Sequence, residues 1–171
     1  MKTLHFILFG YLLVGFHPIV NAQDSLSVDQ ISQKIVGHWA GSGWSRTPDG
    51  NQVTFNQTED IYTKLDGKIL VINGLGRDQT TNEKVFEAFG IINYDAIQNK
   101  LVMNAYTLEG RHTLANFELT PEGFDWWFDA GNGTVKYKAK ISADTWIEEG
   151  YYSPDNENWY PFFSMELKKK S

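Results

Sequence analysis

The sequence predicts an all-β protein: a closed antiparallel up-and-down barrel of about ten strands, preceded by one short helix. Three observations lead to this prediction. Apolar and polar side chains alternate along most of the chain, turn residues separate the alternating runs, and glycines occur inside several runs, as tightly coiled strands require. No internal segment shows a helical pattern long enough for a βαβ crossover, which argues against a parallel sheet.

The first 22 residues are predicted to be a signal peptide. Lys2 supplies the positive start, Leu4 to Val20 form an apolar run, and Val20, Asn21 and Ala22 fit a cleavage site before Gln23. We therefore expect an exported protein, periplasmic or extracellular, with one domain spanning residues 23–171. We expect no stable membrane insertion.

Composition argues against some classes of partner and indicates where the stability of the fold comes from. The net charge is −6 and the only basic run is Lys168 to Lys170, which argues against binding to nucleic acid or to an anionic membrane. The chain has no cysteine, so its stability must come from the core. Six Trp, eight Tyr and eleven Phe make such a core feasible.

The helix is expected just after the leader. Ser27 fits the N-cap with Gln30 as its reciprocal partner, Val28, Ile31, Ile35 and Val36 form an apolar stripe, and Gly37 ends the helix.

Every later segment has a period of two. The clearest strand is Thr134 to Ile141, where Val135, Tyr137, Ala139 and Ile141 alternate with Thr134 and three lysines. Two other strands have an explicit inward face, formed by the odd residues of 53–65 and by Phe124, Trp126 and Phe128. Further strands are expected at residues 38–47, 68–76, 84–93, 100–107, 112–119, 145–153 and 159–167.

The start and end of the domain carry a family resemblance. Gly37, Trp39 and Gly41 resemble the opening G-x-W-x-G strand of lipocalin-like (calycin) barrels. The segment from Trp146 through Ser153 and Asp155 to Leu167 looks like the ending of a bacterial calycin-like family of unassigned function, with Asn156 where that family usually has glycine. The resemblance implies a ligand-binding barrel in which Trp39 plugs the closed end beside the helix. It names no ligand.

Several polar residues share an inward face with apolar neighbours. Gln57 and Glu59 do so in one strand, Glu87 in another and Glu148 in a third. A buried carboxylate is costly unless it is paired, so these groups form an internal polar cluster, hold the head group of a ligand, or lie on a strand whose bulge alters the alternation. The candidate ligand site pairs Glu59 with Arg111. Its other members are Trp44, Trp126, Phe128, Glu148 and Tyr152.

Other chemistries find less support in the sequence. No histidine or cysteine pattern indicates a metal site, no G-x-S-x-G elbow is present, and we assign no cofactor and no catalytic residue. Haem ligation by His112 is weighed as an alternative, but the alternation in its strand points His112 outward. Binding of a small apolar or amphipathic ligand is the leading hypothesis. The alternatives are an enzyme with an interior carboxylate and a ligand-free structural module.

Overall fold

The computed structural model describes residues 22–171, and describes side chains from residue 28 onward. The predicted leader, except for Ala22, therefore lies outside the described residues. The elements are α1 (Ala22–Ile35), β1 (Gly37–Arg46), β2 (Gln52–Lys64), β3 (Ile69–Asp78), β4 (Lys84–Asp95), β5 (Lys100–Thr107), β6 (His112–Leu119), β7 (Gly123–Asp129), β8 (Thr134–Ile141), β9 (Thr145–Ser153) and β10 (Tyr160–Lys170). Among residues 22–171, no helix is long and apolar enough to cross a membrane.

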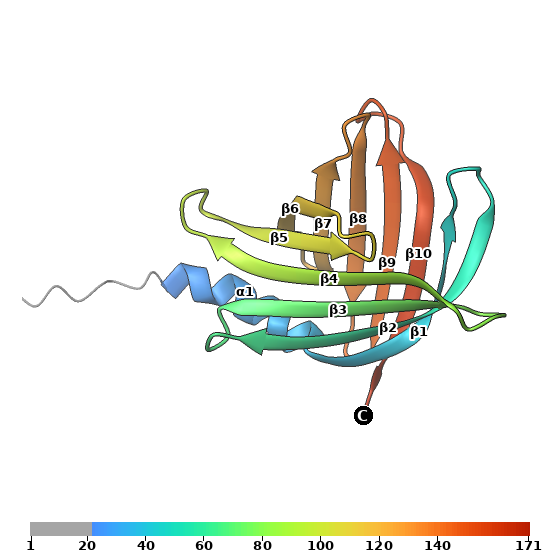
Figure 1. Cartoon of the computed structure of the whole chain (residues 1–171). Helices are drawn as coiled ribbons and strands as arrows, with labels where there is room; N and C mark the ends of the chain where they lie inside the picture. The colour runs from blue at the N-terminus through green and yellow to red at the C-terminus, as the bar shows by residue number, and fades with distance from the viewer. Residues whose placement is uncertain (1–21) are drawn as a thin grey trace, which may run out of the picture.

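The ten strands form one closed barrel. Each strand pairs antiparallel with its sequence neighbour, and β1 closes the ring by pairing with β10, from His38 opposite Lys170 to Ser45 opposite Phe163. In Figure 1, β2 to β5 run across the view while β7 to β10 stand upright, so the two halves of the barrel cross steeply. The predicted up-and-down barrel is confirmed. Closure leaves no sheet edge exposed.

The helix covers one end of this barrel. Val28, Ile31 and Ile35 are at most 1% exposed, as their apolar stripe predicts, and the indole Nε1 of Trp39 donates a hydrogen bond of 2.7 Å to the Ile35 carbonyl. Trp39 is itself fully buried, so it plugs this end as expected from the resemblance. The helix begins at Ala22 rather than after Ser27, which places Ser27 inside the helix instead of at its N-cap.

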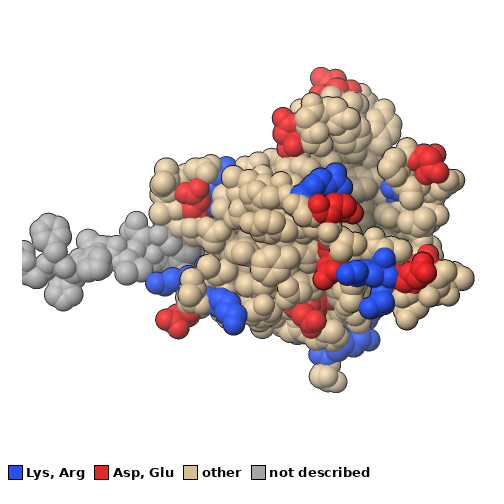
Figure 2. Space-filling view, in the orientation of Figure 1, with Lys and Arg blue, Asp and Glu red and all other residues tan. Residues whose placement is uncertain are grey.

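The tight hairpins use the turn residues expected from the sequence. Between β2 and β3, Asp66 and Gly67 have φ angles of 54° and 83°, a left-handed conformation that a two-residue hairpin needs and that glycine adopts without strain. On the face shown in Figure 2, acidic and basic side chains are interspersed and do not gather by sign.

The apolar core lies at the helix end and continues up the barrel. Its aromatic members interlock: Trp146 meets Trp39 edge-on at a ring distance of 6.0 Å and meets Phe124 edge-on at 5.8 Å. Phe124 also stacks on Phe117 at 5.0 Å. We call the fully packed part of the interior, containing Trp39, Phe117, Phe124, Trp146 and Leu167, the closed half; all five are at most 5% exposed.

Candidate functional site

The other part of the interior is lined by aromatic rings that face inward but are only half-buried. These are Trp126, Phe128, Tyr137 and Phe163, and we call this region the open half. Inward-facing rings can retain exposed surface only if solvent approaches from the uncovered end of the barrel. The rings are closely packed on one another, with Trp126 and Tyr137 stacked at 4.0 Å and an interplanar angle of 5°.

A bulge in β10 adds to this aromatic wall. The register between β9 and β10 shifts between Pro161 and Phe163, so one extra residue is accommodated there. As a result both Phe162 and Phe163 contact the ring of Tyr137, each at 5.6 Å and nearly edge-on. Two consecutive strand residues normally point to opposite faces. The bulge instead lets both phenylalanines pack against the same ring, that of Tyr137.

Three buried polar side chains lie where the closed and open halves meet. Gln57, Glu59 and Glu148 are 3%, 6% and 5% exposed, and we call them the interior polar cluster. Gln57 Nε2 donates a hydrogen bond of 2.8 Å to Glu59 Oε1. The two oxygens of Glu148 each accept a 3.0 Å hydrogen bond, one from the Trp126 indole and one from the Trp146 indole.

Two acceptors of this cluster have no partner. Gln57 Oε1 and Glu59 Oε2 are buried and receive no hydrogen bond. Within residues 28–171, no lysine or arginine forms an ion pair with Glu59 or Glu148. An unpaired buried acceptor costs about 1–3 kcal/mol, so these two oxygens destabilise the interior unless a donor reaches them.

Glycines on β3 provide the space for these side chains. Glu59 lies opposite Gly74 and Gln57 lies opposite Gly76 in the register of β2 and β3. A Cβ at position 74 would come within 2.8 Å of Glu59 Oε1, and one at position 76 within 2.9 Å of Gln57 Oε1. In this arrangement the polar ends rest against the barrel wall. A rotation of each side chain would turn them toward the barrel axis.

Burial raises the pKa values of both carboxyl groups of the cluster toward neutral pH. Burial raises the pKa of Glu59 to about 8 despite the Gln57 hydrogen bond, and the charges of Glu148 and Asp60 raise it further. Burial raises the pKa of Glu148 to about 7, although both indole hydrogen bonds favour its charged form. Burial and the nearby Glu148 also raise the pKa of the Tyr137 hydroxyl.

The structure brings together only some of the predicted site residues. Glu59, Glu148, Trp126 and Phe128 all face the interior, with Phe128 stacked on Trp126 at 6.0 Å. Tyr152 lies at the rim, where its hydroxyl donates a 2.6 Å hydrogen bond to the Asn132 carbonyl.

The predicted pairing of Glu59 with Arg111 is wrong. Arg111 lies in the turn between β5 and β6 with its side chain 78% exposed, and its guanidinium is 3.6 Å from Glu109. Glu59 is buried in β2 opposite Gly74, and none of the described ion pairs joins it to Arg111. Proximity across a barrel depends on strand tilt and register, which the order of residues in the chain does not give.

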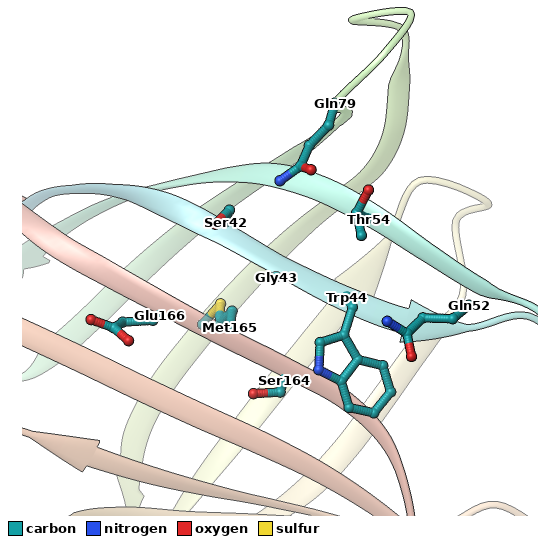
Figure 3. Close-up of a pocket in the computed structure, with 9 residues that line it drawn as sticks. All are labelled: Ser42, Gly43, Trp44, Gln52, Thr54, Gln79, Ser164, Met165 and Glu166. Carbon is teal, nitrogen blue, oxygen red and sulfur yellow. The ribbon is translucent and has the colours of Figure 1, made fainter.

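Trp44 is not part of the interior. Trp39 faces inward in β1, and a residue five positions further must face outward, so the alternation itself contained the signal against Trp44. Figure 3 shows the Trp44 ring beside Ser164 and Gln52, in an open pocket of about 310 Å³ on the outer surface of β1, β2 and β10.

The predicted inward orientation of Glu87 is also wrong. Glu87 is exposed and pairs with Lys84 at 2.6 Å, whereas Gly90 and Ile92 of the same strand are buried. Both faces of β4 carry apolar residues, so the alternation there fits either orientation.

The histidines are placed as expected from their strands. His112 is exposed and stacks on Tyr106 at 4.8 Å, which puts it on the outside of the barrel and away from any axial position within it. His38 is exposed and its Nδ1 is 2.5 Å from Asp60. Among the described residues, no group of three or more His, Cys, Asp or Glu could hold a metal ion.

Comparisons with known proteins agree with this architecture. No family model matches the chain, and the search of curated proteins finds no relative. Rv2717c from M. tuberculosis superposes with a TM-score of 0.64 over 84% of this chain and 98% of its own, at 9% identity. The S-type phycobiliprotein lyase CPES from Guillardia theta gives a TM-score of 0.60 over 84% and 92%, at 11% identity. The chain shares the fold of these two structures, a closed lipocalin-like β-barrel.

At 9–11% identity these two structures establish the fold of the lipocalin-like barrel alone. The site must therefore be argued from its own residues. Three of them were absent from the predicted site: Gln57, Tyr137 and Phe163. The inward faces of residues 53–65 and 134–141 already indicated the first two, whereas Phe163 depends on the β10 bulge.

Proposed function

We propose that this barrel binds a small molecule in its open half and that the interior polar cluster holds the head group of that molecule. The observation that carries the proposal is the pair of unpartnered acceptors, Gln57 Oε1 and Glu59 Oε2. Natural interiors seldom leave two such groups unsatisfied side by side unless they serve a function. A bound ligand with hydrogen-bond donors would satisfy both.

The surroundings define the rest of the ligand. Small-molecule sites are mostly apolar with a few well-placed polar groups. The open half fits this description, because four aromatic rings line it and the interior polar cluster lies at its inner end. An apolar or aromatic body would lie against Trp126, Tyr137 and Phe163. The head would reach Gln57 and Glu59 after their side chains rotate away from the β3 glycines.

Native mass spectrometry of protein purified from its own host tests this proposal. We expect a stoichiometric organic adduct on the wild-type chain and a reduced adduct on Glu59→Leu, which removes the acceptor. Glu166→Leu is the matched control, because Glu166 is exposed on the outside of β10 and should leave the adduct unchanged. A wild-type chain that carries no adduct and yields nothing on solvent extraction would contradict the proposal.

A second candidate function is acid–base catalysis on the bound molecule. The observation that favours it is that Glu59 and Glu148 have pKa values of about 8 and about 7, close to the range in which a general acid or base works best at neutral pH. Incubating the extracted molecule with the protein and following its mass would detect turnover. Conversion by the wild type that persists in both Glu59→Gln and Glu148→Gln would remove these residues from the mechanism.

We also propose that the chain is exported after cleavage behind Ala22. The support is the charged start, apolar run and small-residue site at the N-terminus. Such cleavage would leave the rest of α1 and its buried contacts intact. The intact mass of the protein isolated from its host should correspond to a chain beginning at Gln23; retention of residues 1–22 would contradict export by this route.

A further inference from the structure

The two unpartnered acceptors limit the chemistry of the head group. Gln57 and Glu59 are two residues apart on one face of β2, and the hydrogen bond between them fixes which oxygens remain free: one amide oxygen and one carboxylate oxygen. Neither an amide oxygen nor an ionised carboxylate can donate a hydrogen bond. A head group that satisfies both must carry at least two N–H or O–H donors.

The charge of the interior favours a positive head group. Glu59 and Glu148 influence each other electrostatically, and none of the described ion pairs brings a lysine or arginine to either of them. Among the described residues, the electrostatic neighbours of Glu148 include the Tyr137 hydroxyl, which cannot supply a positive charge. Asp60, on the other face of β2, adds a further negative charge. A buried carboxylate is normally stabilised by a cation, and no ion pair within residues 28–171 supplies one to Glu59 or Glu148.

The aromatic rings favour an apolar ligand body, whereas the free acceptors favour a compact donor group. Trp126 and Tyr137 stack parallel at 4.0 Å, and the Tyr137 ring is edged by Phe162 and Phe163, so these rings offer an apolar surface to a flat body. A primary ammonium group has three donors and one positive charge in a small volume, which matches the two free acceptors and the charge of an ionised Glu59.

Resting on the proposed ligand-binding function, we propose that the open half binds a primary amine, as its ammonium cation, carried on a flat apolar body. The ammonium group donates to Gln57 Oε1 and Glu59 Oε2, and the body lies along Trp126 and Tyr137. Glu148 remains held by its two indole donors and contributes charge without direct contact.

Binding of the cation must be linked to release of a proton. Glu59 is protonated at pH 7 in the free barrel because its pKa is about 8, and it must ionise to accept from the ammonium group. Affinity for the amine should therefore increase by up to about tenfold per pH unit between pH 6 and 7 and level off near pH 8. A neutral ligand that accepts a hydrogen bond from protonated Glu59 would show the opposite trend.

Three probes with one body and different head groups test the inference: 1-naphthylmethylamine, 1-naphthalenemethanol and 1-naphthoate. We expect isothermal titration calorimetry at pH 8 to show the amine binding at least tenfold more tightly than the alcohol, and the carboxylate binding weakest. In phosphate and Tris buffers at pH 7, where Glu59 of the free barrel is still mostly protonated, the observed enthalpies for the amine should differ by the heat of about one released proton.

Variants test whether the preference for the amine depends on the interior polar cluster. Glu59→Gln should abolish the preference for the amine and its pH dependence while leaving binding of the alcohol. Gln57→Met, which removes the amide acceptor but keeps the side-chain volume, should weaken amine binding about tenfold if Glu59→Gln does not fold. Glu166→Gln on the outer face is the control and should change nothing.

Each outcome has a distinct meaning. Binding of the alcohol equal to or tighter than that of the amine overturns the cationic class and leaves the ligand-binding proposal standing. Tight amine binding that Glu59→Gln and Gln57→Met both leave unchanged overturns the assigned site. Failure of all three probes, together with the absence of any adduct in native mass spectrometry, overturns both proposals.

Discussion

The two halves of the barrel interior are built from the same residue types but differ in how completely their aromatic rings are buried. In the closed half, Trp39, Phe124 and Trp146 are at most 2% exposed and meet one another edge-on. In the open half, Trp126, Tyr137 and Phe163 also face inward, yet each keeps accessible surface. Aromatic side chains can serve as core or as binding surface, and only burial distinguishes the two roles.

The two halves also differ in whether their buried polar groups have hydrogen-bond partners. At the helix end, the Trp39 Nε1 donates a hydrogen bond to the Ile35 carbonyl, so the indole of the plug is satisfied. At the boundary with the open half, Gln57 and Glu59 each retain an oxygen without a partner. The closed half therefore supplies stability, whereas the open half sacrifices part of it, which is characteristic of a binding site.

The sharpest test of this contrast removes the plug. Trp39→Ala should lower the free energy of unfolding by about 3–5 kcal/mol, because it deletes a fully buried ring and its hydrogen bond to α1. Urea denaturation measures the loss. Trp44→Ala, on the outer face of the same strand, is the control and should cost less than about 1 kcal/mol. Equal losses in both variants would show that the closed end is not the stabilising half.

The open half should make stability depend on pH. The unfolded chain ionises Glu59 near 4.5, but the folded chain keeps its proton up to a pKa of about 8, so the folded state binds more protons between these values. This contribution is complete below pH 4.5 and is lost as the pH rises through 8. Glu148, with a pKa of about 7, adds in the same direction. Together the two groups should lower the free energy of unfolding by roughly 6 kcal/mol from pH 5 to pH 8 in urea denaturation, more than half of it from Glu59.

Glu59→Gln identifies the source of this pH dependence. The amide does not ionise, so the slope between pH 5 and pH 8 should become markedly shallower while Glu148 accounts for what remains. A slope unchanged from that of the wild type would assign the effect to other groups.

A glycine opposite Glu59 separates stability from binding. In Gly74→Ala the new methyl group would meet both Glu59 oxygens within 2.9 Å and push the carboxylate from the wall toward the barrel axis. We expect a stability loss of about 1–3 kcal/mol together with amine binding equal to or tighter than that of the wild type. Gly90→Ala, whose methyl group would meet the flexible end of Met103, should cost stability without improving affinity. Weaker amine binding in Gly74→Ala alone would place the head group elsewhere.

The smallest effect is expected from the arginine that the sequence suggested for the site. Arg111→Ala should leave the denaturation midpoint, its pH dependence and amine binding unchanged, because this side chain is exposed in a turn and near Glu109. A change in the apparent pKa of the stability profile would mean that Arg111 acts on the interior after all.

Local patterns were sufficient for the outline of the molecule. The alternation in residues 134–141 put Tyr137 inward, the stripe Val28, Ile31 and Ile35 formed the buried face of α1, and turn residues separate the strands, as Asp66 and Gly67 do between β2 and β3. These features depend on the fixed side-chain periods of strands and helices. Such periods are local, so a short segment of sequence is enough to reveal them. The same alternation placed Gln57, Glu59 and Glu148 in the interior.

What the local pattern could not decide was which interior residues meet. The tilt and stagger of ten strands bring Glu148 near Glu59 and leave Arg111 outside, and a bulge turns Phe162 and Phe163 toward one ring. On β4, apolar residues on both faces left the orientation of Glu87 to the pairing with β3. Distances across a closed barrel arise from register and closure, which are properties of the whole sheet rather than of any segment.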